Sequence, residues 1–394
     1  MQKEKLVPAI RFKGFDEDWN NKLVKSLSYI TTGNSNTQDS VLNGTYPFFI
    51  RSDKPLRSNK YLYDEEAVIT IGDGNIGKVF HYINGKFDLH QRCYKISNFT
   101  DILGKYFYWY FSSNFYDRVI KMSAKATVDS VRLEMIADMK IYFPSNKKEQ
   151  SKISTFLDSL DYLIHSQELK LEKLQTIKQS LLDKMFIKNN QHMPNVRFNS
   201  YYDYWYYVNI QECSKVFIGL VTTMTTNYSK HGVLLIRNSD IKEGRFEFDE
   251  NPIHLEWSFA MRNKSRMHME GDVVTVHTGD VGTSAVVSEK EAKSIGFATI
   301  VTRPDKNKLD SSFLSVFLNT ETHKKWAVQI STGDGRTNYN LGDYKLLNIP
   351  MTNLSEQQKI GQFFSNLDSL IHSQEQKLEK LNNIKQALLE KMFC

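Results

Sequence analysis

The chain has 394 residues, of which 40% are hydrophobic and 24% charged, and its formal net charge is +6. That length suits two domains of about 150 residues with connecting elements better than one ordinary domain. No stretch approaches the roughly 18 unbroken apolar residues of a membrane helix, and Met1–Phe12 lacks the apolar core of a secretory signal, so we expect a cytoplasmic protein. The three cysteines, Cys93, Cys213 and Cys394, lack zinc-binding spacing, and we expect no bound metal.

The first part of the chain carries the excess positive charge, and its opening residues match a later segment. All of the excess positive charge lies in residues 1–148, which hold 22 Lys and Arg against 16 Asp and Glu. This mild excess suits a polyanionic partner without proving one. At an offset of 186, the residues Pro8, Arg11, Phe12, Trp19, Gly33, Ile50 and Arg51 match Pro194, Arg197, Phe198, Trp205, Gly219, Ile236 and Arg237.

Residues 61–79 are rich in Val, Ile, Thr and Tyr and contain a Gly-Asp turn, which is typical of strands joined by a tight turn. Gly72–Val79 nearly matches the phosphate-binding pattern G-x-x-x-x-G-K-[ST]. Val79, however, lacks the hydroxyl group that would hold magnesium, and Phe80–Ile83 reads as a strand instead of a helix. We therefore favour a turn between two strands over a nucleotide site.

A helix is predicted over residues 101–123, followed by an apolar strand before Pro144. The second half repeats this order with about 20 additional residues. Residues 271–288 are again strand-like, Gly279 and Gly282 correspond to Gly74 and Gly77, and an apolar strand is expected before Pro350.

The strongest signal is a pair of long repeated segments. Residues 149–186 align without a gap on residues 356–393, and 26 of the 38 positions are identical. Apolar residues recur at steps of three or four without Pro, which predicts two helices of roughly 57 Å. A lone helix exposing such a stripe is marginal in water, so the copies are expected to pack together. The predicted interface positions are Leu160, Ile164, Leu171, Leu174, Leu181, Leu367, Ile371, Leu378, Leu381 and Leu388.

Basic side chains follow a strand-end arginine in each half. Arg can pair bidentately with guanine edges and Lys neutralises phosphates, although a strand-end Arg is often only structural. Because the glycine turns recur in both halves, we expect them to face the same ligand. The predicted DNA-binding residues are Arg51, Ser52, Lys54, Arg57, Asn75, Lys78 and Lys125 in the first half, and Arg237, Asn238, Lys242, Arg245, Thr278 and Arg336 in the second.

Catalytic patterns are weak. Asn251-Pro252-Ile253 lacks the second proline of an amine-methylating loop, and the ten histidines show no metal-binding spacing. We predict no catalytic residue.

Three marks occur together: the Pro-x-(Ile/Val)-Arg-Phe openings at Pro8 and Pro194, the Glu-Gln-x-Lys-Ile helix starts at Glu149 and Glu356, and the repeated Lys-Leu-Glu-Lys-Leu segments. In this combination the whole chain resembles the specificity subunit, HsdS, of type I restriction-modification systems. The resemblance implies an α+β fold, in which two similar mixed α/β target-recognition domains are joined by two long helices forming an antiparallel, pseudo-two-fold coiled coil. The recognition domains are expected at residues 1–148 and 192–353, and the helices at 149–191 and 354–394.

The resemblance further implies that each recognition domain binds one part of a bipartite, asymmetric DNA target, with the spacer fixed by the helices. It implies two methyltransferase subunits docked around the helices, and restriction subunits that translocate DNA. S-adenosylmethionine, ATP and Mg²⁺ would be used by those partners, while this chain would bind no cofactor and would not be an enzyme. Two alternatives stay open: a non-enzymatic protein-binding scaffold with a coiled coil, and a nucleotide-dependent enzyme using Gly72–Lys78.

Overall fold

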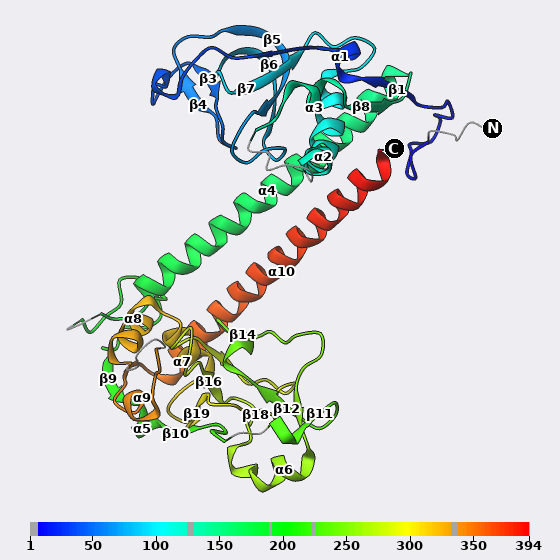
Figure 1. Ribbon diagram of the computed structural model, residues 1–394. Coiled ribbons are helices and arrows are strands. Elements are labelled where there is room, and N and C mark those ends of the chain that lie inside the picture. Colours follow the sequence, from blue (N-terminus) through cyan, green and yellow to red (C-terminus); the bar gives the residue numbers. More distant parts are fainter. Residues whose placement is uncertain (1–6, 124–129, 189–190, 223–224, 332–336, 394) are drawn as a thin grey trace. The chain divides into compact units, whose positions relative to one another are not determined.

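The chain divides into two compact units in the computed structural model, which describes residues 7–123, 130–188, 191–222, 225–331 and 337–393. Unit 1 comprises residues 1–168 and 377–394, and unit 2 comprises residues 169–376 (Figure 1). The sequence predicts four segments in chain order. In the structure, each mixed α/β domain forms one compact unit with one half of each long helix.

Unit 1 is built on a six-stranded sheet of order β2-β7-β5-β6-β3-β4, in which only β3 and β6 pair in parallel. As predicted, Phe80–Ile83 continues as a strand after the glycine turn, and the region 101–123 is largely helical. Helix α2 packs on β5 and β6. The elements are β1 (Asn20–Leu23), α1 (Val24–Leu27), β2 (Tyr29–Thr32), β3 (Tyr46–Phe49), β4 (Leu56–Ser58), β5 (Tyr63–Ile71), β6 (Phe80–Leu89), β7 (Cys93–Ser97), α2 (Gly104–Ser123), α3 (Leu133–Ala137) and β8 (Lys140–Phe143).

Unit 2 repeats this plan with two four-stranded sheets, β10-β19-β16-β17 and β11-β15-β12-β18. Its parallel pair, β12 with β18, corresponds to β3 with β6. The elements are β9 (Tyr206–Asn209), α5 (Ile210–Cys213), β10 (Ser214–Ile218), β11 (Tyr228–Ser229), β12 (Val233–Ile236), β13 (Ile241–Lys242), β14 (Arg245–Phe246), β15 (His254–Leu255), α6 (Trp257–Arg262), β16 (Val273–Thr275), β17 (Ser284–Val286), β18 (Ile295–Gly296), β19 (Ile300–Pro304), α7 (Ser311–Leu318), α8 (Glu321–Ile330), α9 (Leu341–Tyr344) and β20 (Asn348–Met351).

The strand that closes each domain pairs with the strand that opens it. β8 pairs with β1 and ends before Pro144, as expected. β20 pairs with β9 but runs through Pro350 to Met351, one position beyond the predicted proline boundary. A two-stranded sheet consists of edge strands, where a residue without a backbone N–H is tolerated.

The two long helices are α4 (Lys147–Met185) and α10 (Leu354–Met392). Each is preceded by an asparagine whose side-chain oxygen caps the first turn. The Asn146 oxygen accepts from the Lys148 N–H at 2.9 Å, and that of Asn353 accepts from the Glu356 N–H at 3.0 Å. The caps satisfy amides that have no partner within the helix, and they fix where each helix starts. Neither helix contains a proline, which would interrupt it.

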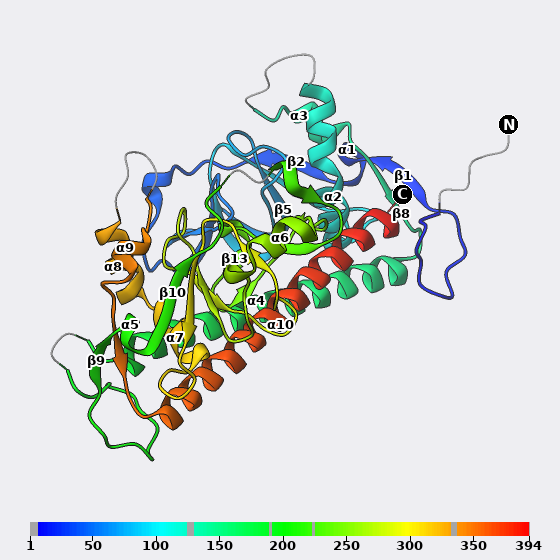
Figure 2. The ribbon, with the colours of Figure 1, turned by 90° about the horizontal axis from the view of Figure 1, so that it is seen from below.

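Each domain packs between the start of one long helix and the end of the other. In unit 1, Leu157 of α4 shares a core with Met392 and Phe393 at the end of α10, and the two stretches lie side by side (Figures 1 and 2). In unit 2, Met185 and Phe186 pack with Phe364, and further members of the same cluster are Trp205, Phe313, Tyr339 and Tyr344. Met and Phe of the duplicated Lys-Met-Phe ends are therefore core residues, whereas Lys184 and Lys391 are exposed.

Ion pairs give the direction of the helices within each unit. In unit 1, Lys385 of α10 pairs with Asp161 of α4, and in unit 2, Lys178 of α4 pairs with Asp368 of α10 at 2.7 Å. In unit 1 the beginning of α4 contacts the end of α10, so the paired stretches there run antiparallel. In unit 2 the end of α4 contacts the first half of α10.

Within the described part of the chain, no helix is long and apolar enough to cross a membrane.

Candidate nucleic-acid interface

In unit 1 the strand-end arginine and the glycine turn meet. Arg51, which follows β3, donates to both carboxylate oxygens of Asp73 at 3.1 and 3.2 Å, and Arg92 donates to the same carboxylate at 2.7 Å. Burial alone would raise the pKa of Asp73, but the hydrogen bonds from Arg92 and Arg51 hold that pKa below its usual range. The result is an exposed pair of guanidinium groups centred on one ionised carboxylate.

The glycine turn of unit 1 connects β5 to β6 and packs against α2. Gly74 and Gly77 have φ angles of 84° and 70°, which favour glycine. A Cβ atom on Gly77 would lie 3.2 Å from the Cα of Tyr116, so the turn approaches the helix closely. Asn75 is exposed at the tip, and the ammonium of Lys78 lies 4.8 Å from the centre of the Tyr116 ring.

The same framework occurs in unit 2 with different side chains. Gly279 and Gly282 have φ angles of 103° and 87°, and a Cβ on Gly282 would lie 3.1 Å from the His323 ring. The strand end is tied to this turn because the side chain of Asn238 accepts from the His277 N–H at 2.8 Å. Thr278, in the turn, donates its hydroxyl to Asn338 at 2.9 Å.

Arg237 is held by two carboxylates in unit 2. Its guanidinium donates to Asp240 at 2.6 Å and to Asp249 at 2.8 Å, and these hydrogen bonds raise the pKa of Arg237. Arg237 is half-buried, in contrast to the more exposed Arg51. It therefore remains charged and fixed in one orientation.

The other predicted DNA-binding residues are distributed unevenly. Lys54 and Lys242 are exposed, and the Ser52 hydroxyl donates to the Lys54 carbonyl at 2.6 Å. Arg57 donates to the carbonyls of Gly44 and Thr45, so its guanidinium ties down the loop before β3. Arg245 is shared between Glu247 and Glu375 of α10. Lys125 and Arg336 lie outside the described residues.

Sequence reasoning did not place three side chains beside these turns, although it named Lys324 among basic residues that could extend the surface. Arg92 reaches Asp73 from the segment between β6 and β7, and Asn338 contacts Thr278 from a segment 60 residues later. Lys324 of α8 lies near Asp280, in the glycine turn, at 3.8 Å. No local pattern marks these residues, since sheet and helix packing brings them to the turn.

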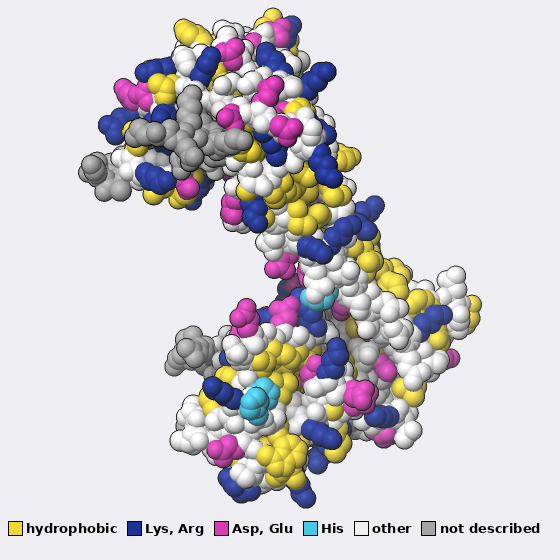
Figure 3. Space-filling view, turned by 90° about the vertical axis from the view of Figure 1, so that its right-hand side faces the viewer, with side chains coloured by type: hydrophobic (Ala, Val, Ile, Leu, Met, Phe, Trp, Pro, Cys, Tyr) yellow, Lys and Arg dark blue, Asp and Glu magenta, His cyan; other side chains and the backbone are white. Residues whose placement is uncertain are grey.

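Charge is mixed on the surface of each unit. Figure 3 shows Lys and Arg side chains interspersed with Asp and Glu, without one large patch of a single sign on the visible face. Such a surface gives moderate non-specific attraction to phosphates, so recognition of a nucleic acid would depend on particular side chains.

The predicted interface positions of the helices are all at least half-buried. Ile164 and Ile371 are each 6% exposed, while the other eight, Leu160, Leu171, Leu174, Leu181, Leu367, Leu378, Leu381 and Leu388, are of intermediate exposure. This burial places the stripe on a packing face, and its role in binding other subunits stays a prediction.

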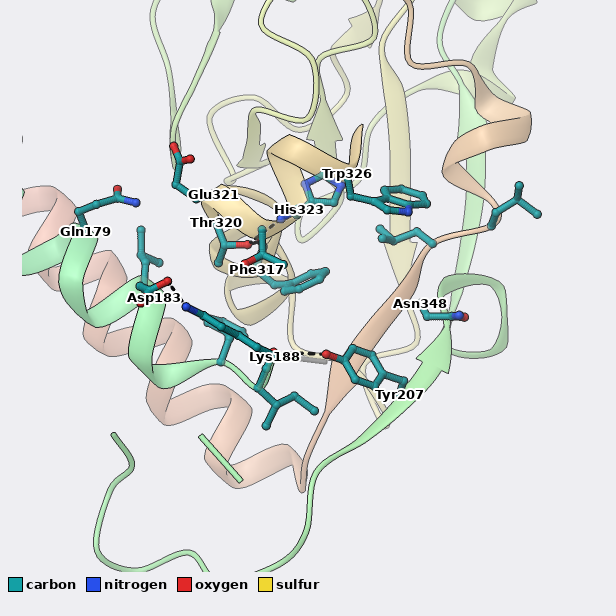
Figure 4. Close-up of a pocket in the computed structure, with 16 residues that line it drawn as sticks. Gln179, Asp183, Lys188, Tyr207, Phe317, Thr320, Glu321, His323, Trp326 and Asn348 are labelled. Atoms are coloured by element: carbon teal, nitrogen blue, oxygen red, sulfur yellow. Dashed lines mark hydrogen bonds and ion pairs between the residues drawn. The ribbon is translucent and has the colours of Figure 1, made fainter. Parts of the chain in front are cut away.

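A cavity of about 390 Å³ opens in unit 2 beside the end of α4. In Figure 4, His323 and Trp326 of α8 lie on one side of it, and Lys188 and Tyr207 lie on the other. Both ring nitrogens of His323 are engaged, by the Leu318 carbonyl at 2.6 Å and the Tyr339 hydroxyl at 3.3 Å. Burial lowers the pKa of His323 to about 4, so the ring is neutral and poorly placed for proton transfer.

No group of three or more His, Cys, Asp or Glu side chains is placed to hold a metal ion among the residues that the structure describes. Around the glycine turns, the two units repeat one backbone framework. Its two copies share backbone features and differ in their polar side chains.

Comparison with known proteins points to one family. A sequence profile of the type I restriction modification DNA specificity domain matches residues 16–178 and 187–383. The specificity subunit of the Escherichia coli type I restriction enzyme EcoDI is 22% identical, over 95% of this chain and 88% of its own length. The EcoBI specificity subunit of the same species is 24% identical, over 84% and 74%. A crystal structure of the type I restriction-modification S subunit from M. genitalium has a TM-score of 0.69 at 16% identity, covering 98% of this chain and 99% of that one. At that identity the structural match shows a shared fold.

Proposed function

Because the chain belongs to the type I restriction modification DNA specificity family, we propose that its two units read the two parts of one bipartite DNA target. The family supplies the role of DNA specificity. The assignment of one part of the target to each unit is our inference from the duplicated fold.

One observation carries this proposal: the same framework holds different side chains in the two units. Each unit brings the end of a strand against a glycine turn, through Arg51 and Asp73 in unit 1 and through Asn238, next to Arg237, and His277 in unit 2. In unit 1 the turn presents Asp73 to Arg51 and Arg92, whereas in unit 2 it presents Thr278 to Asn338. Because the two units share a backbone framework, both can dock on a duplex in the same way. Because their side chains differ, they can recognise different base sequences.

We assign base or phosphate contact first to Arg51 and Arg92 with the tip of the turn, Asn75 and Lys78, in unit 1. In unit 2 we assign it to Arg237, Lys242 and Thr278. Arg57 and Arg245 are less suited, since Arg57 is bonded to two backbone carbonyls before β3 and Arg245 is paired with Glu375 of the long helix α10. Arg51, Arg92 and Arg237 are also paired with carboxylates of their own chain, and these ion pairs must open before the guanidinium groups can bind DNA.

The long helices are proposed to fix the spacer between the two parts of the target and to dock two methyltransferase subunits. At 1.5 Å per residue, a 39-residue helix is about 58 Å long, which exceeds the roughly 34 Å of one DNA turn. S-adenosylmethionine, ATP and Mg²⁺ would act in partner subunits, and the chain itself would serve without catalysis. The strand β6 after Gly72–Lys78 also argues against a phosphate-binding loop, which requires a helix there.

The proposal is tested with the chain assembled with the methyltransferase subunits of its host. Methylated adenines are mapped genome-wide to define the target, and binding to that duplex is compared with binding to a duplex of scrambled sequence. We expect binding at least 1,000-fold tighter to the target, which is typical of specific recognition. Equal binding to both duplexes would contradict the proposal and favour a protein-binding scaffold.

A further inference from the structure

Unit 2 contains a short hairpin that begins four residues after the strand-end Arg237. β13 and β14 pair antiparallel, with Ile241 opposite Phe246 and Lys242 opposite Arg245. Ile241 is buried, and it packs with Phe246 in a cluster of apolar residues from β16 and β17. The base of the hairpin is therefore fixed in the core, and its tip consists of Glu243 and Gly244.

The tip lies against both long helices. Gly244 has a φ of 72°, and a Cβ on it would lie 2.8 Å from the carboxylate of Asp368 in α10. The Glu243 carboxylate accepts from Lys178 of α4 at 3.3 Å and from Lys324 of α8 at 2.8 Å. Lys178 also pairs with Asp368 at 2.7 Å. One ionic network thus joins the hairpin tip to α4, α8 and α10.

The network has the properties of a fixed contact. Lys178 is only 14% exposed, so its ammonium depends on carboxylate partners. Burial alone would raise the pKa of Glu243, but Lys324 and Lys178 hold it below its usual range, so Glu243 is ionised at neutral pH. Partly buried ion pairs of this kind are screened less by salt than exposed ones.

The other end of the hairpin holds the strand-end arginine. Asp240 accepts from the backbone N–H of Arg237 at 2.8 Å and from its guanidinium, and the Asp240 carbonyl accepts from the Glu247 N–H at 2.8 Å. A second tie to α10 runs from Arg245 to Glu375 at 3.5 Å. A continuous set of bonds therefore leads from Arg237 to the helices.

We propose that the hairpin 241–246 is a strut that sets the position of the DNA-reading end of unit 2 on its helices, with Glu243 as the main positioning residue. This inference rests on the proposed function, because it concerns how accurately one part of the target is placed. Unit 1 is tied to its helix differently, by Lys105 of α2, which pairs with Asp158 of α4 at 2.6 Å. The strut therefore acts on the part of the target read by unit 2.

The test measures spacer preference. The full chain with its methyltransferase subunits is titrated with the mapped target duplex, and with duplexes whose spacer is one base pair longer or shorter. Glu243→Gln keeps the size of the side chain but removes its charge, and we expect the preference for the natural spacer to fall by about fivefold. Lys324→Met removes a partner from α8 and should lower the preference in the same direction.

Glu321→Gln is the matched control. Glu321 also lies in α8, but it forms an exposed i,i+4 pair with Lys325, and its loss should leave spacer preference unchanged. Hydrogen exchange of β16 and β19 shows whether each variant keeps its core. Wild-type spacer preference retained in both Glu243→Gln and Lys324→Met would overturn the strut alone. A wild-type complex without any spacer preference would contradict the proposed function as well.

Discussion

The guanidinium of Arg11 forms two hydrogen bonds, of 2.7 and 2.8 Å, with the carboxylate of Glu149, a residue 138 positions later. Arg197 and Glu356 repeat this bidentate pair in unit 2 with the same two distances. Both carboxylates are essentially buried and lie in the first turn of a long helix. The short opening segment of each domain is thereby fastened to the helix that follows that domain.

Loss of one partner from this pair is expected to destabilise its unit strongly. Arg11→Ala leaves the Glu149 carboxylate buried without its countercharge, and the free energy of unfolding of unit 1 should fall by about 3–5 kcal/mol. Lys25→Ala is the control, since Lys25 and Asp138 form an exposed pair, 57% and 44% accessible, whose loss should cost less than about 1 kcal/mol. Urea titration of both variants gives the comparison, and equal losses would contradict a role for the buried pair.

Replacing Arg51 should weaken recognition of one part of the target. If Arg51 pairs with a base edge, Arg51→Ala costs about 1–3 kcal/mol of specific binding and relaxes preference at one base position. Competition binding with single-base variants of the target provides the measurement. A uniform loss at all positions would instead assign Arg51 to a phosphate.

Asp73 is expected to restrain the two arginines beside it. Asp73→Asn removes the ionised carboxylate that accepts from Arg51 and Arg92. Affinity for non-specific duplex should rise, and its dependence on salt concentration should become steeper, because more cationic charge is free to displace counterions. An unchanged salt slope would show that neither arginine approaches the phosphates.

The stability of unit 2 should fall as the pH drops from about 6.5 toward 4. Burial lowers the pKa of His268 to about 4, and its Nδ1 lies 2.8 Å from the Ser294 hydroxyl. An unfolded histidine binds a proton below about pH 6.5 while the folded one does not, so stability is complete above that pH and is lost as the pH falls. At pH 5 the loss for this histidine is about 2 kcal/mol relative to pH 7.

His268→Gln removes the titrating group, so the decrease between pH 7 and pH 5 should become smaller even if the variant is less stable at both values. Urea unfolding monitored by hydrogen exchange in β18 and β19 reports on unit 2 itself. The same decrease in the variant and the wild type would exclude His268 as a source of the pH dependence.

The measuring role of the helices predicts the effect of an insertion. Four residues inserted near Gln175 extend α4 by about 6 Å, or roughly two base pairs. Methylation mapping should show a longer spacer between unchanged specified bases. The same four residues inserted between the exposed Glu289 and Lys290 should leave the spacer as it was. A spacer that is equal in both insertions would remove α4 from this role.

Local sequence was sufficient for the long helices and the glycine turns. Helical periodicity extends over 38 residues in each copy, and Gly77 and Gly282 mark turns because glycine adopts positive φ angles at little steric cost. The repeated motifs at Arg11 and Glu149 were also evident, but not that they bind each other, since that contact spans 138 positions. Pairing across such distances leaves no local trace.

Less of the candidate site could be predicted from the sequence, for the same reason. Arg92 joins Arg51 only because β5 pairs with both β6 and β7, and nothing in the segment around Arg92 repeats in the second half. Arg245 was expected to face DNA because it is basic and follows a strand-end arginine. Its bonds to Glu247 and Glu375 depend on how the hairpin packs on α10, and residue type alone does not encode that.

Replacement of residues 20–145 by the corresponding segment of another specificity subunit is the most direct test of independent reading by the two units. The hybrid is expressed with its methyltransferase subunits, and methylated adenines are mapped across a host genome. A target in which one part is new, while the other part and the spacer are retained, is the result we predict. A target changed in both parts would contradict the account.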